Sequence, residues 1–133
     1  MYARARHRYQ EESVYSASPA KRFLMLFDRL IVDLDAAHTC FEESDLFGVH
    51  TALRHGQDIV HLMMVSLRDD IWEGARNLYQ LYGYALNELI QANLLKDRER
   101  LKNAELVLRP LHATWHEAAR LLEADGTEIH GVA

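Results

Sequence analysis

The fold is decided by the stretch NLYQLYGYALNELIQAN, residues 77–93. Its apolar residues recur at steps of three and four, which is the spacing of a buried helix face. One stripe at this spacing comprises Ala75, Leu78, Tyr82, Ala85, Leu89 and Ala92. A second stripe beside it comprises Tyr79, Gly83, Leu86 and Ile90. At about 100° per residue the two stripes cover roughly 200° of the helix, more than a helix with one buried face needs. The surplus apolar surface must be covered by another part of the chain or by a partner.

Helical spacing continues along most of the chain. The four predicted helices span about 19–41, 45–67, 72–95 and 98–122. Ser18 and Pro19 open the first, because a serine hydroxyl caps free backbone N–H groups and proline suits the first helical position. Ser44 or Asp45 precedes the second helix, and Asp97 is placed to cap the fourth.

The pattern predicts an all-α protein. Pro110 lies inside the fourth helix, where proline removes a backbone hydrogen bond, so we expect a kinked or split last helix. No segment shows the alternation of a strand. Four amphipathic helices joined by short polar breaks predict an antiparallel up-and-down four-helix bundle. We assign residues 18–124 to this helical bundle domain, residues 1–17 to a mobile N-terminal arm and residues 125–133 to a loose C-terminal tail.

Composition argues against several classes of protein. The chain has 133 residues, 49% of them hydrophobic and 26% charged, which suits one ordered domain. The net charge is −5, and only the first 22 residues are basic, so a nucleic-acid surface is not expected. Cys40 is the only cysteine, which excludes an internal disulfide and favours a reducing, cytoplasmic location. We find no signal peptide and no run of about 18 apolar residues, so membrane insertion is not expected either.

The eight histidines raise a metal-dependent enzyme as an alternative function. His112 and His116 are four residues apart on one helix, but alanine stands where a zinc protease motif needs glutamate. A di-iron bundle needs two Glu-x-x-His motifs, and the chain offers only Asp35 and His38 at that spacing. Phosphate-binding glycine loops and nucleophile elbows are absent from the sequence. We therefore expect no catalytic residue, no metal and no cofactor, with the histidines solvated or capping helices.

The order of local motifs carries the interpretation further. The chain presents in turn Tyr9, Ser13-Val14, Ala17-Ser18-Pro19, Leu24-Met25-Leu26-Phe27-Asp28, Gln57-Asp58-Ile59-Val60, Asn77-Leu78-Tyr79-Gln80-Leu81-Tyr82-Gly83-Tyr84, Leu89, Ala92-Asn93 and Trp115. This order resembles the FliS family, the flagellar export chaperones of flagellin, over roughly residues 9–119. The Ala-Ser-Pro opening and the Asn-Leu-x-x-Leu-Tyr-x-Tyr run are together the most specific part of the resemblance.

The resemblance implies a cytoplasmic helical bundle that binds the disordered C-terminal segment of flagellin. Binding would block premature filament assembly and keep the subunit ready for the flagellar type III export gate. The family is not enzymatic. In this family the N-terminal arm can lie over the binding surface when flagellin is absent, and Tyr9 and Val14 are the matching apolar side chains here.

The residues themselves favour such a mode, in which an amphipathic segment lies in an apolar trough. The apolar residues that we expect to line the trough are Ile59, Leu62, Val65, Tyr79, Leu86 and Ile90. We expect Gln57, Asn77 and Asn93 to hydrogen-bond the partner's backbone, although Asn77 and Asn93 suit hydrogen bonds at a helix end equally well. We add Tyr9 from the arm and Tyr82, although the place of Tyr82 on the main stripe favours the core.

Other interpretations stay open. Tyr79 and Leu86 suit the core of the bundle as well, and Ile59 suits a contact with the first or the fourth helix. The glycines within the helices, such as Gly56 and Gly83, fit either close helix packing or the floor of a groove. The surplus stripes also fit a structural homodimer, in which a second copy of the chain covers them.

Overall fold

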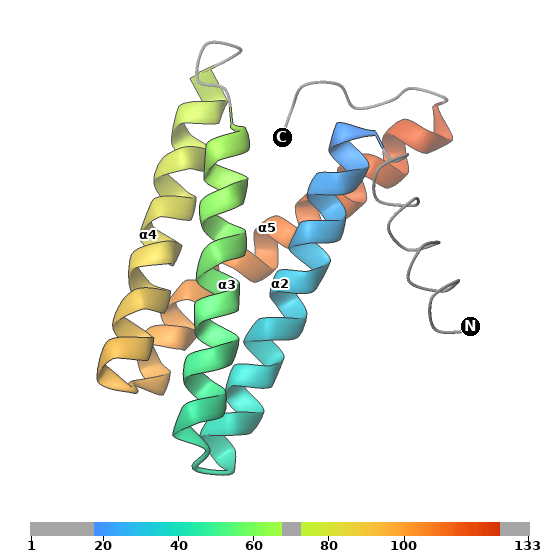
Figure 1. Cartoon of the computed structure of the whole chain (residues 1–133). Helices are drawn as coiled ribbons and strands as arrows, with labels where there is room; N and C mark the ends of the chain where they lie inside the picture. Colours follow the sequence, from blue (N-terminus) through green and yellow to red (C-terminus); the bar gives the residue numbers. More distant parts are fainter. Residues whose placement is uncertain (1–17, 68–72, 126–133) are drawn as a thin grey trace, which may run out of the picture.

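The computed structural model describes residues 18–67 and 73–125, which form four α-helices (Figure 1). They are α2 (Pro19–Glu42), α3 (Leu46–Ser66), α4 (Glu73–Leu95) and α5 (Arg98–Ala124). Consecutive helices run in opposite directions and pack on one another, and α5 returns to pack on α2. The predicted all-α four-helix bundle is confirmed. The expected arm, residues 1–17, lies outside the described residues, as does residue 126 onward of the expected tail.

The predicted helix caps are present at three helix starts. The Ser18 hydroxyl accepts a hydrogen bond from the Lys21 backbone N–H at 3.2 Å, one residue before Pro19 begins α2. Asp45 Oδ1 accepts from the Gly48 N–H at 2.9 Å at the start of α3. Asp97 Oδ1 accepts from the Glu99 N–H at 3.0 Å at the start of α5. These bonds satisfy backbone donors that a helix leaves free in its first turn, so each helix begins where its capping side chain stands.

Two tight turns close the α2–α3 and α4–α5 hairpins. Ser44 and Lys96 have positive φ angles of 56° and 51°, the left-handed conformation that often follows the last residue of a helix. After Ser44, the Asp45 N–H bonds the Cys40 carbonyl at 2.8 Å, and after Lys96, the Asp97 N–H bonds the Ala92 carbonyl at 3.0 Å. Both turns therefore end one helix and place the capping aspartate of the next.

Pro110 does not split α5. The helix is continuous from Arg98 to Ala124, so of the two alternatives raised by the sequence the split is wrong. Leu108 is fully buried just before the proline, and Leu111 and Trp115 pack on the core just after it. Packing on both sides of Pro110 holds the helix together across the missing hydrogen bond.

The core is filled by apolar side chains at helical spacing, among them the first stripe of α4. Its largest fully buried side chains are Tyr82, Phe27, Leu30, Leu34, Leu53, Met63, Leu89, Leu101, Leu108, Val49 and Val60. All four helices contribute to this cluster. None of the described helices combines the length and the apolar character that crossing a membrane requires.

An aromatic cluster joins α2, α4 and α5. The ring of Phe23 lies edge-on to those of Phe27 and Trp115, with centroid separations of 6.0 and 5.4 Å, and Phe27 meets Tyr82 at 6.3 Å. The Trp115 Nε1–H donates a hydrogen bond of 3.0 Å to the Tyr82 hydroxyl. Burial raises the pKa of Tyr82 to about 12, although the bond from Trp115 lowers it. The neutral phenol is therefore part of the folded core.

Replacing Tyr82 with Phe keeps the ring but removes the acceptor for the Trp115 N–H. We expect the free energy of unfolding at pH 7 to fall by about 1 kcal/mol. As pH rises above about 10, the unfolded phenol ionises while the folded one keeps its proton up to about 12. The wild-type chain should therefore lose about 2–3 kcal/mol of stability through this group between pH 10 and 12.

Urea unfolding followed by circular dichroism at pH 7, 10 and 12 measures both effects. The Tyr82→Phe variant shares every other titrating group, so the difference between the two pH profiles isolates this phenol. Parallel profiles above pH 10 would contradict a buried, neutral Tyr82.

Candidate partner-binding surface

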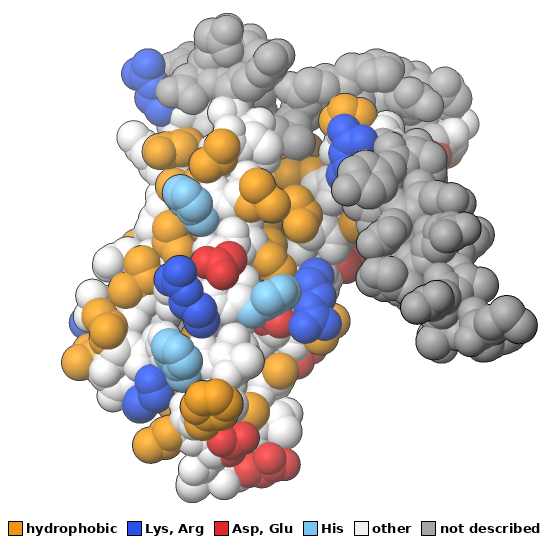
Figure 2. Space-filling model, viewed as in Figure 1, with side chains coloured by type: hydrophobic (Ala, Val, Ile, Leu, Met, Phe, Trp, Pro, Cys, Tyr) orange, Lys and Arg blue, Asp and Glu red, His pale blue; other side chains and the backbone are white. Residues whose placement is uncertain are grey.

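The outer side of α3 and α4 carries exposed apolar side chains from both helices. Leu62 and Val65 of α3 are 50% and 67% exposed, and Tyr79 of α4 is 46% exposed. Leu86 and Ile90 follow Tyr79 along the same side of α4, and both are half-buried. We call these five residues the α3–α4 surface. Figure 2 shows orange apolar side chains from the upper to the lower part of this view of the molecule, with charged and histidine side chains between them.

Gly83 lies within the stripe of Tyr79 and Leu86, and the chain's own Met64 lies opposite it. A methyl group added to Gly83 would lie 3.5 Å from the Met64 Cε, which is ordinary van der Waals contact. A methyl added to Gly56 would lie 3.4 Å from Leu30 Cδ1. Both glycines thus face a neighbouring helix of the same chain, which fits the close-packing interpretation and not the floor of an open groove.

Four residues predicted to contact a partner are buried in this structure. They are Gln57, Ile59, Tyr82 and Asn93. The Gln57 amide donates to the Leu89 carbonyl at 3.5 Å. Asn93 donates through Nδ2 to His50 Nδ1 at 3.0 Å, and its Oδ1 accepts from Lys96 Nζ at 2.8 Å. These amides therefore tie α3 to α4 and hold the turn after α4.

The remaining predicted residues are not gathered with the α3–α4 surface. Asn77 is exposed, but it lies two residues before Tyr79 and therefore about 160° away around α4. Tyr9 lies outside the described residues. Tyr79, Leu86 and Ile90 thus lie together along one side of α4. Leu62 lies two residues before Met64, which faces Gly83 of α4, and therefore about 160° away from it around α3, while the polar part of the prediction is dispersed.

Sequence reasoning missed other exposed apolar side chains. They include Met25, Val32, Leu46, Phe47, Leu81, Tyr84, Leu94, Leu95, Leu106 and Leu121. Phe47, at 80% exposed, is the most exposed large apolar side chain among the described residues. Tyr84 and Leu95 lie off both stripes of α4, so their spacing alone was a signal that they face solvent. Exposed apolar surface is therefore not confined to the outer side of α3 and α4.

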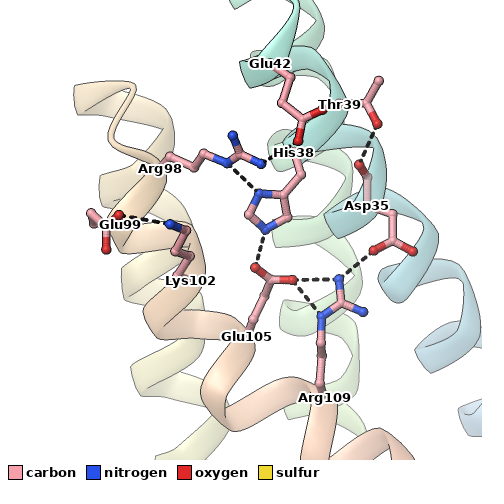
Figure 3. Close-up of polar contacts among 9 residues, drawn as sticks. All are labelled: Asp35, His38, Thr39, Glu42, Arg98, Glu99, Lys102, Glu105 and Arg109. Carbon is pink, nitrogen blue, oxygen red and sulfur yellow. Dashed lines mark hydrogen bonds and ion pairs between the residues drawn. The ribbon is translucent and has the colours of Figure 1, made fainter.

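A polar network fills the α2–α5 interface on another side of the bundle (Figure 3). The Arg98 Nε–H donates to His38 Nδ1 at 2.9 Å, so His38 carries its proton on Nε2 and donates it to Glu105. Arg109 joins Glu105 to Asp35, with contacts of 2.6 Å to each carboxylate. Asp35 and His38, the one pair at di-iron spacing, are thus engaged by charged partners from α5, which does not fit a di-iron ligand pair.

The match to known proteins covers most of the chain. Residues 1–121 match the family model described as the flagellar protein FliS. The chain belongs to the FliS family. The resemblance that the motifs indicated is therefore confirmed.

Three relatives with the same family name support this assignment. It is 31% identical to the flagellar secretion chaperone FliS of Salmonella typhimurium over 109 residues, which cover 80% of this chain and 81% of that one. The identity with the Escherichia coli protein of the same name is 30% over 110 residues, 81% of each chain. With the Bacillus subtilis protein it is 25% over 123 residues, covering 92% of this chain and 90% of that one. FliS is a chaperone family, so the chain is not an enzyme and the metal-dependent enzyme alternative is wrong.

Replacing Gly83 with Ala tests whether this position serves packing. Alanine stabilises a helix interior by about 1 kcal/mol relative to glycine, and the flexible end of Met64 accommodates the new methyl. We expect the free energy of unfolding to rise by about 0.5–1 kcal/mol, measured by urea unfolding.

Gly56→Ala is the matched control, because its methyl would lie closer to its neighbours, at 3.4 Å from Leu30 and 3.8 Å from Asp33. Its gain should be smaller than that of Gly83→Ala. A destabilised Gly83→Ala variant would show that α3 and α4 are packed too tightly here for any side chain.

Proposed function

We propose that this chain is a cytoplasmic flagellar export chaperone that binds the disordered C-terminal segment of flagellin. Binding prevents premature polymerisation of the subunit and keeps it ready for type III flagellar secretion. The observation that carries the proposal is the FliS family match over residues 1–121, together with relatives named as flagellar secretion chaperones.

The α3–α4 surface supports a binding role of this kind. Leu62, Val65 and Tyr79 expose apolar area that the bundle leaves uncovered, and an amphipathic segment gains free energy by burying such area. Leu86 and Ile90 continue the apolar stripe along α4, so a segment lying along this helix meets a row of side chains.

The buried amides of Gln57 and Asn93 reduce the number of polar contacts that we propose with the partner. Because Gln57 and Asn93 are engaged within the bundle, we propose that the partner is held mainly through apolar side chains and its own internal hydrogen bonds. A partner helix satisfies its own backbone groups, and unpaired ones would cost about 1–3 kcal/mol each when buried. Ordering a flexible segment also offsets part of the contact energy, which suits a complex that must be released at the export gate.

Tyr79→Ala and Leu62→Asp should each weaken binding of the flagellin C-terminal segment by about tenfold or more. Tyrosine is enriched among residues that dominate binding energy, and tenfold corresponds to about 1.4 kcal/mol. Leu62→Asp places a charge within an apolar contact. Isothermal titration of the full chain with a peptide of the C-terminal segment measures both affinities, and circular dichroism checks that the fold is kept.

Matched controls are available on other faces. Tyr84→Ala removes a tyrosine of the same helix that is 47% exposed but lies about 140° around α4 from Tyr79. Leu106→Asp places the same charge on an exposed leucine of α5. Both controls should bind normally. If the controls lose affinity and the test variants do not, the α3–α4 surface is the wrong face; if the wild-type chain does not bind the peptide, the proposed function itself fails.

A further inference from the structure

Three side chains that can ligate a metal converge where α5 meets the first half of α2. Asp28 Oδ1 lies 2.7 Å from His112 Nε2 and 2.6 Å from His116 Nε2. All three ligand atoms lie within 4.8 Å of one another, and no other such group occurs among residues 18–67 and 73–125. The cluster joins the same two helices as the Asp35–His38 network but shares no residue with it, and it lies on other helices than the α3–α4 surface.

We propose that Asp28, His112 and His116 form a zinc-binding site that joins α2 to α5. Two imidazole nitrogens and one carboxylate oxygen are a donor set that Zn²⁺ accepts, with a fourth position left for water. The proposal is independent of flagellin binding.

The geometry is close to what the ion requires. Histidines four residues apart lie on one face of a helix, and here both Nε2 atoms point to the same carboxylate oxygen. Around a tetrahedral Zn²⁺ with bonds near 2.0 Å, neighbouring ligand atoms lie roughly 3.3 Å apart. The carboxylate oxygen has to move outward from both histidines, which rotation of the half-exposed Asp28 provides, and the two imidazoles adjust from a cluster whose ligand atoms already lie within 4.8 Å of one another.

The surroundings favour ligation. The His112 ring packs on Phe27 with a centroid separation of 5.3 Å, and the two imidazoles meet edge-on at 4.6 Å, which fixes their orientation. Burial raises the pKa of Asp28, but hydrogen bonds from His112 and His116 lower it more, so the carboxylate is ionised at neutral pH. Asp28 and His116 are exposed enough for an ion to enter from solvent.

A bound ion would link helices that are far apart in sequence. Of the four principal helix–helix interfaces, that between α2 and α5 is the smallest. Zn²⁺ on this site would fix the C-terminal half of α5, beyond Pro110, against α2. The sequence alone does not indicate this site, because no glutamate follows His112 as it does in the zinc protease motif. The third metal ligand is Asp28, which lies 84 residues before His112 and is brought to the histidines only by the fold.

Titration of the untagged full-length chain with zinc chloride tests the proposal. We expect one equivalent of Zn²⁺ to bind and the midpoint of thermal unfolding to rise, because the ion binds the folded chain preferentially. Asp28→Asn and His116→Ala should each weaken Zn²⁺ binding by more than about tenfold, the lower range of losses seen even for residues that only orient ligands. Hydrogen exchange in residues 110–122 should slow on Zn²⁺ addition in the wild-type chain but not in Asp28→Asn or His116→Ala.

His61→Ala is the matched control, because it removes an exposed histidine of α3 and leaves the cluster intact. This control should keep wild-type affinity and the rise in the unfolding midpoint. Absence of Zn²⁺ binding, unchanged affinity in Asp28→Asn, or an equal loss in His61→Ala would each overturn the proposal. Circular dichroism of the three variants confirms that lost binding is not lost folding.

Discussion

The aromatic contact among α2, α4 and α5 positions the rest of the bundle. Tyr82 is fully buried, accepts a hydrogen bond from Trp115 and lies against Phe27. This contact commits the main stripe of α4 to the core, and so it decides which way the second stripe faces. Tyr79, Leu86 and Ile90 consequently lie on the side of α4 that is next to α3. Packing against α3 leaves all three side chains partly exposed to solvent. The exposed apolar side chains of this face are thus a result of how the core is anchored.

Polar contacts set the pairing of the helices around that core. Asp33 is buried on α2 and is held by His55 of α3 at 2.5 Å, and the buried Glu88 of α4 is held by Arg100 of α5 at 3.1 Å. Among the described residues no buried side-chain nitrogen or oxygen lacks a partner. Because an unpaired buried carboxylate is costly, each of these pairs disfavours other arrangements of the same amphipathic helices. The apolar stripes supply the free energy of burial, while the polar pairs select one neighbour for each helix.

Most of the fold followed from local signals, and the candidate site followed only in part. Helix periods, capping residues and the main stripe of α4 depend on spacing alone, and these predictions are confirmed. Ile59 was harder to place, since a residue beside the main stripe of its helix is buried or exposed according to the helices that pack against it. Asn93 bonds His50 and Lys96 at the end of α4, and the bond to His50 is known only once α3 and α4 are paired. Asp28 and His116 were connected only by the return of α5 to α2, which no local pattern encodes.

The two left-handed turns at Ser44 and Lys96 have a consequence for how the chain reaches its native state. Each closes a hairpin of helices whose contacts lie close together in sequence, and both turns lie at the same end of the bundle (Figure 1). Topologies dominated by such local contacts have low contact order and fold within microseconds to milliseconds. We therefore expect the α2–α3 and α4–α5 hairpins to form early and then dock. A ribosome adds about 5–20 residues each second, so it needs seconds to complete another polypeptide. A chain that folds in this way reaches its native state long before then.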